Sequence, residues 1–152
     1  MPTKTLSGRH AGAVIQFSVF TPNRLGRLRD LVNVLGYHNV HVLALMVLDT
    51  TDSAIIRIVL DDPDKARVLL NEHGFPFTES TIVAVEVNSP EELNRVMAAL
   101  LEAELNVNYL YSFISHSHGK SIVGLSTEDN ETAEQILKRH QFPVLKQSDI
   151  SR

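Results

Sequence analysis

The sequence contains no cysteine, which excludes disulfides, thiolate metal sites and a cysteine nucleophile together. It also has no basic run, and with a net charge of -4 we expect no nucleic-acid partner. The longest apolar stretch, residues 40–48, is too short to span a bilayer and includes His41, so we expect no membrane partner. Residues 1–12 lack the apolar centre of a signal peptide. They are predicted to form a flexible tail on a cytoplasmic protein.

Recognisable catalytic patterns are missing as well. No Ser/His/Asp set, paired carboxylates or phosphate loop with Gly-Lys-Ser/Thr is visible, so we expect no enzymatic activity and no cofactor. His116 and His118 could offer two imidazoles to a metal, but the sequence supplies no further ligands. A solvated turn is the favoured interpretation there, and no metal site is predicted. His73 and His140 are predicted to end equivalent helices, where a cation suits the helix dipole.

An internal repeat is the main positive feature. A shift of 67 positions brings similar segments into register, which indicates two copies of one unit. The matched segments are 39–40 with 106–107, 61–66 with 128–133, and 75–76 with 142–143. We therefore predict a tail over residues 1–12, a first repeat over 13–79 and a second over 80–152.

Both copies show the same order of predicted elements: strand, helix, strand, strand, helix, strand. In the first copy the strands are expected over 13–20, 40–48, 54–60 and from 77, with helices from 25 and 63. In the second copy the elements are expected over 82–87, 91–104, 107–116, 120–126, 131–140 and 144–147. The fold class is therefore α+β, with two tandem ferredoxin-like βαββαβ repeats, each an antiparallel sheet with helices on one face.

The junction and the sheet faces suggest further packing. Residues 77–87 contain no glycine or proline, so we expect the copies to be rigidly fused, with one strand shared between them. Residues 42–47 are apolar on both faces of their strand, and two helices can cover only one face of a sheet. The other face must meet another sheet, from the sister repeat or from a second chain, and we predict a homodimer.

The ordered set of short motifs resembles the ACT domain family, and in particular its stand-alone tandem members. The resemblance covers about residues 13–148. It rests on segments 23–28, 39–40, 49–52, 61–66 and 106–113. Residues 23–28 read Asn-Arg-Leu-Gly-Arg-Leu where the family tends to show Asn-x-Pro-Gly-x-Leu, so Leu25 replaces the usual proline. The resemblance implies an amino-acid-sensing module whose ligand binds across a dimer interface.

The first predicted helix is the candidate ligand site. It is expected to begin around Arg24 to Gly26, where unpaired N–H groups and the helix dipole favour an anion. We expect no carboxylate in its first turn, which Arg24, Arg27 and Arg29 surround. Gly26 would let a ligand approach the backbone.

Two asparagines extend this site. Asn23 and Asn39 offer donors and acceptors for an amino acid's carboxylate and ammonium, at points where the resemblance implies such residues. The predicted ligand-binding residues are Asn23, Arg24, Leu25, Gly26, Asn39 and Val40. The alternative is structural: Asn23 caps the helix, Gly26 eases packing and Asn39 lies in a turn.

The second copy differs at the equivalent helix start. Ser89, Pro90 and Glu92 form a predicted capping box, and Glu91 adds repulsion, so we expect no acid to bind there.

Two further features have open interpretations. The aromatic side chains of Tyr109, Tyr111 and Phe113 share one strand face and belong to a core, a sheet interface or an aromatic-ligand pocket. Arg57 either anchors a carboxylate or lays its stem along a sheet edge.

These observations favour a non-catalytic regulatory protein that binds a small molecule, an amino acid above all, at a domain or dimer interface. Binding would be passed to a partner by population shift. The alternative is a ligand-free interaction module, or a regulatory subunit that docks a metabolic enzyme. An enzyme is the third hypothesis, and no residues in the sequence carry it.

Overall fold

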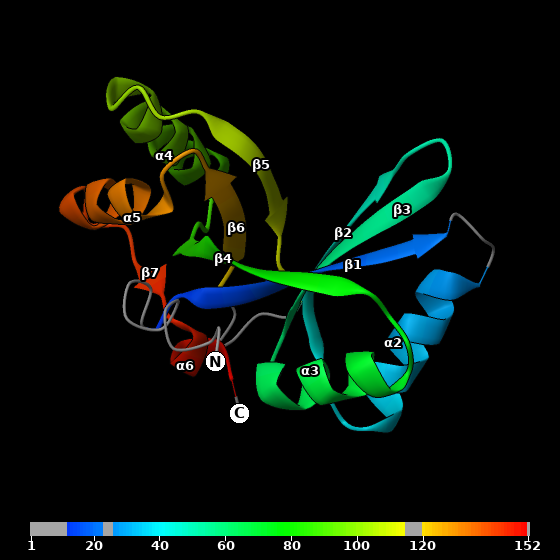
Figure 1. The fold of residues 1–152 in the computed structure, drawn as a ribbon. Coiled ribbons are helices and arrows are strands. Elements are labelled where there is room, and N and C mark those ends of the chain that lie inside the picture. Colours follow the sequence, from blue (N-terminus) through cyan, green and yellow to red (C-terminus); the bar gives the residue numbers. More distant parts are fainter. Residues whose placement is uncertain (1–11, 23–25, 115–119, 152) are drawn as a thin grey trace. The chain divides into compact units, whose positions relative to one another are not determined.

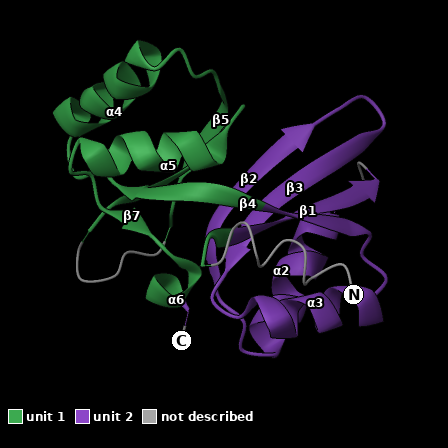
Figure 2. Ribbon diagram, turned by 60° about the vertical axis from the view of Figure 1, so that its left-hand side comes forward, with its two compact units in different colours: residues 1–14, 81–150 green, residues 15–80, 151–152 purple. Residues whose placement is uncertain are grey.

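The computed structural model describes residues 12–22, 26–114 and 120–151. The chain divides into two compact units (Figure 2). Unit 1 contains residues 1–14 and 81–150, and unit 2 contains residues 15–80 and 151–152. Strand β4, Phe77–Glu86, is continuous across the boundary, as the absence of glycine and proline in this segment predicted. No helix among the described residues is long and apolar enough to cross a membrane.

Unit 2 is a four-stranded sheet with two helices (Figure 1). Besides the start of β4, its elements are β1 (Val14–Pro22), α2 (Arg27–Tyr37), β2 (Val42–Asp49), β3 (Ser53–Leu60) and α3 (Pro63–Glu72). The strand order is β2-β3-β1-β4, and β3 pairs antiparallel with both β1 and β2. This is the predicted ferredoxin-like arrangement, in which the first and third strands of the repeat are central.

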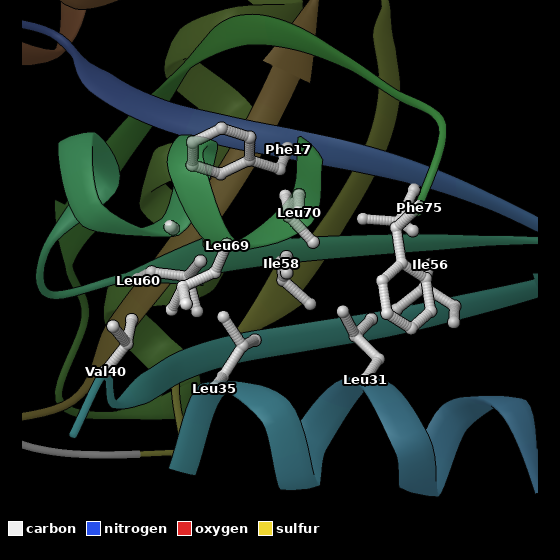
Figure 3. Close-up of a cluster of buried hydrophobic side chains, with 12 residues drawn as sticks. Phe17, Leu31, Leu35, Val40, Ile56, Ile58, Leu60, Leu69, Leu70 and Phe75 are labelled. Carbon is white, nitrogen blue, oxygen red and sulfur yellow. The ribbon is translucent and has the colours of Figure 1, made fainter. Parts of the chain in front are cut away.

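The core of unit 2 lies between the sheet and its helices. Leu31 and Leu35 of α2 are fully buried and point toward Ile56 and Ile58 of β3 (Figure 3). Leu28 and Val32 extend the apolar stripe of the same helix, but they are 37% and 41% exposed. The apolar stripe of α2 is therefore wider than the part of it that the sheet covers.

Unit 1 repeats the same architecture. Besides the end of β4, its elements are α4 (Pro90–Glu102), β5 (Val107–Ser112), β6 (Ile122–Thr127), α5 (Asn130–Arg139), β7 (Val144–Leu145) and α6 (Gln147–Ile150). Strands β6 and β7 both pair with β4, and β5 pairs with β6, so the repeat has the same internal order as unit 2. The fold class predicted from the sequence is confirmed.

Strands β5 and β7 of unit 1 end earlier than the sequence predicted. Strand β5 ends at Ser112, before the predicted residue 116. The last strand, predicted to reach residue 147, ends at Leu145 because the chain then turns into the short helix α6. Asp149 closes this turn, since its carboxylate accepts from the N–H of Lys146 and its own N–H donates to the Lys146 carbonyl.

All four long helices end in the same way. After each helix one residue adopts a positive φ, and the last free carbonyls accept bonds of the Schellman pattern. The positive-φ residues are Asn39, Gly74, Glu104 and Gln141. In α2 the N–H of Asn39 donates to the Gly36 carbonyl and that of Val40 to the Leu35 carbonyl. The residue of unit 1 equivalent to Asn39 is therefore Glu104, and not Asn106 as the 67-residue offset implies.

This geometry predicts that Glu104→Gly stabilises the protein. Glu104 has φ 58, a left-handed conformation that costs a residue with a Cβ about 1–2 kcal/mol. Glycine removes that cost but gains about 0.4–1 kcal/mol of entropy in the unfolded chain. We expect a net gain of roughly 0.5–1 kcal/mol in the free energy of unfolding, measured by urea denaturation. If the stability of the Glu104→Gly variant is unchanged or lower, the backbone at Glu104 is not strained.

A second stability prediction concerns Gly124 on β6. A Cβ built there lies 2.9 Å from Ile82 Cδ1 and 3.3 Å from Phe113 Cε1. Gly124→Ala should therefore cost about 1–3 kcal/mol by overpacking. Ile82→Val removes the nearest atom, so the double variant should lose less stability than the sum of the two single losses. If the two losses are simply additive, contact with Ile82 is not what limits the space for a larger side chain at position 124.

Candidate functional site

The start of α2 differs from the other long helices. Its N-cap is Gly26, with φ 93, and no side chain of the described residues caps the helix. In α3, α4 and α5 the side chains of Asp62, Ser89 and Asp129 each accept a backbone N–H of the first turn. The first N–H groups of α2 are therefore left without a side-chain cap in the part of unit 2 that the structure describes. Asn23, Arg24 and Leu25 lie outside the described residues.

The charge at this helix start differs from the sequence prediction. Because α2 begins at Arg27, Asp30 falls in its first turn, so the expectation that no carboxylate is present there was wrong. Asp30 Oδ2 lies 3.5 Å from Nη1 of Arg27, whose guanidinium also lies 4.4 Å from the centroid of the Phe75 ring. The side chain of Arg27 therefore lies over the Phe75 ring. Asp30 offsets part of the positive charge of the first turn of α2.

The predicted site residues lie at both ends of α2 (Figure 1). Gly26 precedes the helix, whereas Asn39 and Val40 follow it. Eleven residues at about 1.5 Å each make α2 roughly 17 Å long. Val40 is buried, and Asn39 has an exposed side chain. A small ligand therefore cannot contact Gly26 and Asn39 of the same chain.

Pro22 and Arg57 have defined partners in the sheet of unit 2. Pro22 pairs with Ser53, which brings the β2–β3 turn next to the end of β1. The hydroxyl of Thr50 donates to the Ser53 carbonyl at 2.7 Å and closes that turn. Arg57 lies opposite Ser18 and Met46 in the central strand β3. The interpretation of Arg57 as a sheet-edge residue was therefore wrong, since β3 has a strand on each side.

The start of α4 confirms most of the predicted cap. Ser89 Oγ accepts from the Glu92 N–H at 3.1 Å. Glu92 Oε2 accepts from the N–H of Asn88 at 2.8 Å, one residue earlier than a capping box predicts. Two carboxylates, Glu91 and Glu92, occupy this first turn. The start of α4 is therefore capped and negatively charged, which disfavours binding of an anion there.

The remaining sequence candidates are mainly structural. Tyr111 and Phe113 are buried, and the rings of Tyr109 and Tyr111 stack with centroids 6.3 Å apart. His73 and His140 are the C-cap residues of α3 and α5, as predicted. His116 and His118 lie outside the described residues. Within the described residues no group of three or more potential metal-ligating side chains occurs.

Unit 1 contains a cavity of about 230 Å³ that the sequence did not predict. It lies between the side of α5, the middle of β4 and the end of β7, and charged side chains of both signs line it together with apolar ones. Glu131, Glu134, Lys138 and Lys146 provide the charges. The signal that could have revealed it is the exchange of Arg67 and Glu79 in the first repeat for Glu134 and Lys146 in the second.

The two units define a duplicated ferredoxin-like α+β protein, and comparisons with known proteins agree with this class. The model of a family described as an ACT domain pair matches residues 12–152, so the chain belongs to this family. No match was found among curated proteins. The chain is similar to the crystal structure of protein BT0572 from Bacteroides thetaiotaomicron, with 26% identity and a TM-score of 0.84. That similarity covers 94% of this chain and 99% of the other.

Two structures of lower identity share the fold. The regulatory subunit of aspartate kinase from Thermus thermophilus, in its ligand-free form, is 15% identical with a TM-score of 0.58. The match covers 84% of this chain and 92% of that subunit. A structure of aspartokinase alpha and beta subunits is 16% identical with a TM-score of 0.52, covering 85% of this chain and 96% of the other.

Proposed function

We propose that this chain is a non-catalytic regulatory protein of the cytoplasm that binds a free amino acid between two copies of itself. Membership of the ACT domain pair family supports a regulatory role. The shared fold of the regulatory subunit of aspartate kinase adds a precedent for a partner enzyme. The proposed ligand residues are Asn23, Arg24, Leu25, Gly26, Asn39 and Val40.

One observation carries the proposal: no side chain within the described part of the chain caps the start of α2, whereas the other long helices each have such a cap. First-turn N–H groups without a cap can receive the carboxylate of an amino acid. Asn39 is exposed and carries both a donor and an acceptor, which suits the rest of the ligand's polar group. The length of α2 separates Gly26 and Asn39, so the site is complete only when a second chain supplies the other end.

The outer surface of α2 supports such a pairing. A twofold axis brings the same surface of two chains together, and antiparallel helices then place the start of one beside the end of the other. Leu28 and Val32 are exposed on α2, and β2 is the outermost strand of unit 2. Val47 and Leu48 of β2 are exposed as well. Pairing would remove this apolar surface from water.

A second candidate function is a ligand-free module that docks a metabolic enzyme. It is favoured by apolar side chains on unit 1, where Leu101 is 77% and Ile114 is 63% exposed. Such side chains can anchor a protein interface, and a docking module needs no free amino acid. The two candidates therefore differ in whether a small ligand changes the state of the isolated protein.

Light scattering after size-exclusion chromatography, with and without each of the twenty amino acids at millimolar concentration, tests the proposal. The amino-acid-binding protein is expected to be a dimer, and one amino acid should lower the protein concentration at which dimers form. This follows because a ligand bound by both copies stabilises the dimer by mass action. A dimerisation constant unaffected by all twenty would favour the docking module.

A further inference from the structure

The cavity of unit 1 has an apolar floor and a charged rim. Val83 of β4 belongs to the apolar layer packed against α5, and Ile82 and Leu145 also line the cavity. Successive turns of α5 contribute Glu131, Glu134 and Lys138 to the rim. Lys146 faces them from the end of β7, and its aliphatic stem lies beside Gly12, where a built Cβ would be 3.2 Å from Lys146 Cδ. Both signs of charge therefore meet above an apolar surface.

The equivalent place in unit 2 is closed by an ion-pair network. Arg67 donates to both carboxylate oxygens of Glu79 at 2.7 Å and to Asp64 at 3.0 Å. The hydrogen bond to Glu79, reinforced by the one to Asp64, holds the pKa of Arg67 above its usual value. A bidentate guanidinium–carboxylate pair of this kind has fixed geometry and fills the space between helix and strand. In unit 2, α3 is thus tied directly to β4.

The same three positions carry different charges in unit 1. The 67-residue offset places Glu131, Glu134 and Lys146 where unit 2 has Asp64, Arg67 and Glu79. Glu134 pairs with Lys138 on its own helix at 2.7 Å. Among the described residues, the ammonium of Lys146 and the carboxylate of Glu131 form no ion pair. The bridge across the gap is therefore missing, and a cavity stands in its place.

We propose that this cavity is a second binding site, separate from the end of α2, for a small zwitterion such as a free amino acid. Glu131 and Glu134 would receive the ligand's ammonium group, and Lys146 its carboxylate. The apolar side chain of the ligand would lie against the part of β4 and the end of β7 that line the cavity. The bound zwitterion then joins α5 to the end of β7, as the Arg67–Glu79 bridge joins helix and strand in unit 2.

The polar groups around the cavity narrow the class of ligand. Asn130 is committed to the protein, since its amide donates to the Thr81 carbonyl and accepts from the Thr127 N–H. Asp129 caps α5, so the first turn of this helix does not offer an uncapped anion site. Because Glu134 and Lys138 already pair, a ligand with only one charge leaves either Glu131 or Lys146 uncompensated. The volume of about 230 Å³ lies below the usual range for drug-sized ligands, which fits a molecule of few atoms.

Nuclear magnetic resonance of the ¹⁵N-labelled full chain, titrated with each of the twenty amino acids, tests the site. The expected result is that at least one amino acid shifts the amide signals of Ile82, Val83 and Glu134. Its N-acetyl derivative lacks the ammonium group and its amide derivative lacks the carboxylate, so both should bind at least tenfold more weakly. Equal binding of either derivative would overturn the assignment of a zwitterion.

A charge exchange provides the matched variant. The double substitution Glu134→Arg with Lys146→Glu installs the charges of Arg67 and Glu79 in unit 1. It is expected to close the cavity, weaken binding there at least tenfold and raise the melting temperature of the free protein. Because stability rises while binding falls, misfolding cannot imitate this result.

The two proposed sites can fail independently. Asn39→Gly should leave the signal shifts of Ile82, Val83 and Glu134 unchanged, because Asn39 belongs to unit 2. The cavity proposal is overturned if none of the twenty amino acids shifts these signals, or if the double variant binds as tightly as the parent. In either case, loss of binding in Asn39→Gly would still support the site at α2.

Discussion

Phe17→Ala is expected to lower the free energy of unfolding by about 3–5 kcal/mol. Phe17 is fully buried in the core of unit 2, and its ring meets Phe77 edge-on with centroids 5.6 Å apart. Truncation to alanine removes this contact and leaves a cavity that β1, a central strand, cannot easily fill. Urea denaturation followed by circular dichroism measures the loss.

Phe20→Ala is the matched control on the same strand. Phe20 is 40% exposed, so truncation removes less buried surface and should cost clearly less than at Phe17. The two substitutions make the same chemical change three residues apart. Equal losses at the two positions would contradict the assignment of Phe17 to the core and Phe20 to a partly exposed face of β1.

The second large effect is stabilisation by a ligand at α2. An amino acid present at about a hundred times its Kd should add about 2.7 kcal/mol to the free energy of unfolding. For a chain of this size the melting temperature should rise by several degrees. In the Glu134→Arg/Lys146→Glu background, in which the cavity of unit 1 is closed, Asn39→Gly is expected to abolish the rise, because it removes the amide while glycine readily adopts φ 62. Thermal melting with the twenty amino acids measures both results.

Glu104→Gly supplies the control for this experiment. It makes the same backbone change at the equivalent helix end in unit 1 but leaves the α2 site intact. The ligand-induced rise in melting temperature should therefore persist in Glu104→Gly. A rise that survives Asn39→Gly in the background with the closed cavity would exclude Asn39 from the binding site at α2.

Features that depend on nearby residues could be predicted from the sequence. The caps formed by Asp62 and Ser89 require only a short polar side chain at the right spacing before a helix. The tandem fold followed from the internal repeat, since strands and helices at matching positions indicate equivalent units. The start of α2 was harder to predict. Gly26 occupies the N-cap position with a positive φ, and no side chain among the described residues marks the boundary.

Features that depend on three-dimensional packing could not be predicted. The offset of 67 aligned Asn39 with Asn106, but α4 is longer than α2, and Glu104 occupies the equivalent helix end. The separation of Gly26 from Asn39 also required the position where α2 begins and ends. The cavity beside α5 depends on where Lys146 lies relative to Glu134, which the sequence pattern does not specify.

The most direct measurement is a calorimetric titration of two variants mixed in equal amounts. Gly26→Asn blocks one end of α2 while keeping a residue that tolerates positive φ, and Asn39→Gly removes the polar group at the other end. The titrant is the amino acid that stabilises the parent most, and the signal from the cavity of unit 1 is subtracted with the Gly26→Asn/Asn39→Gly double variant. If each ligand touches both chains, neither variant alone should bind at α2, whereas mixed dimers contain one intact site. Binding restored by mixing would establish the shared site, and a mixture as inactive as its components would contradict it.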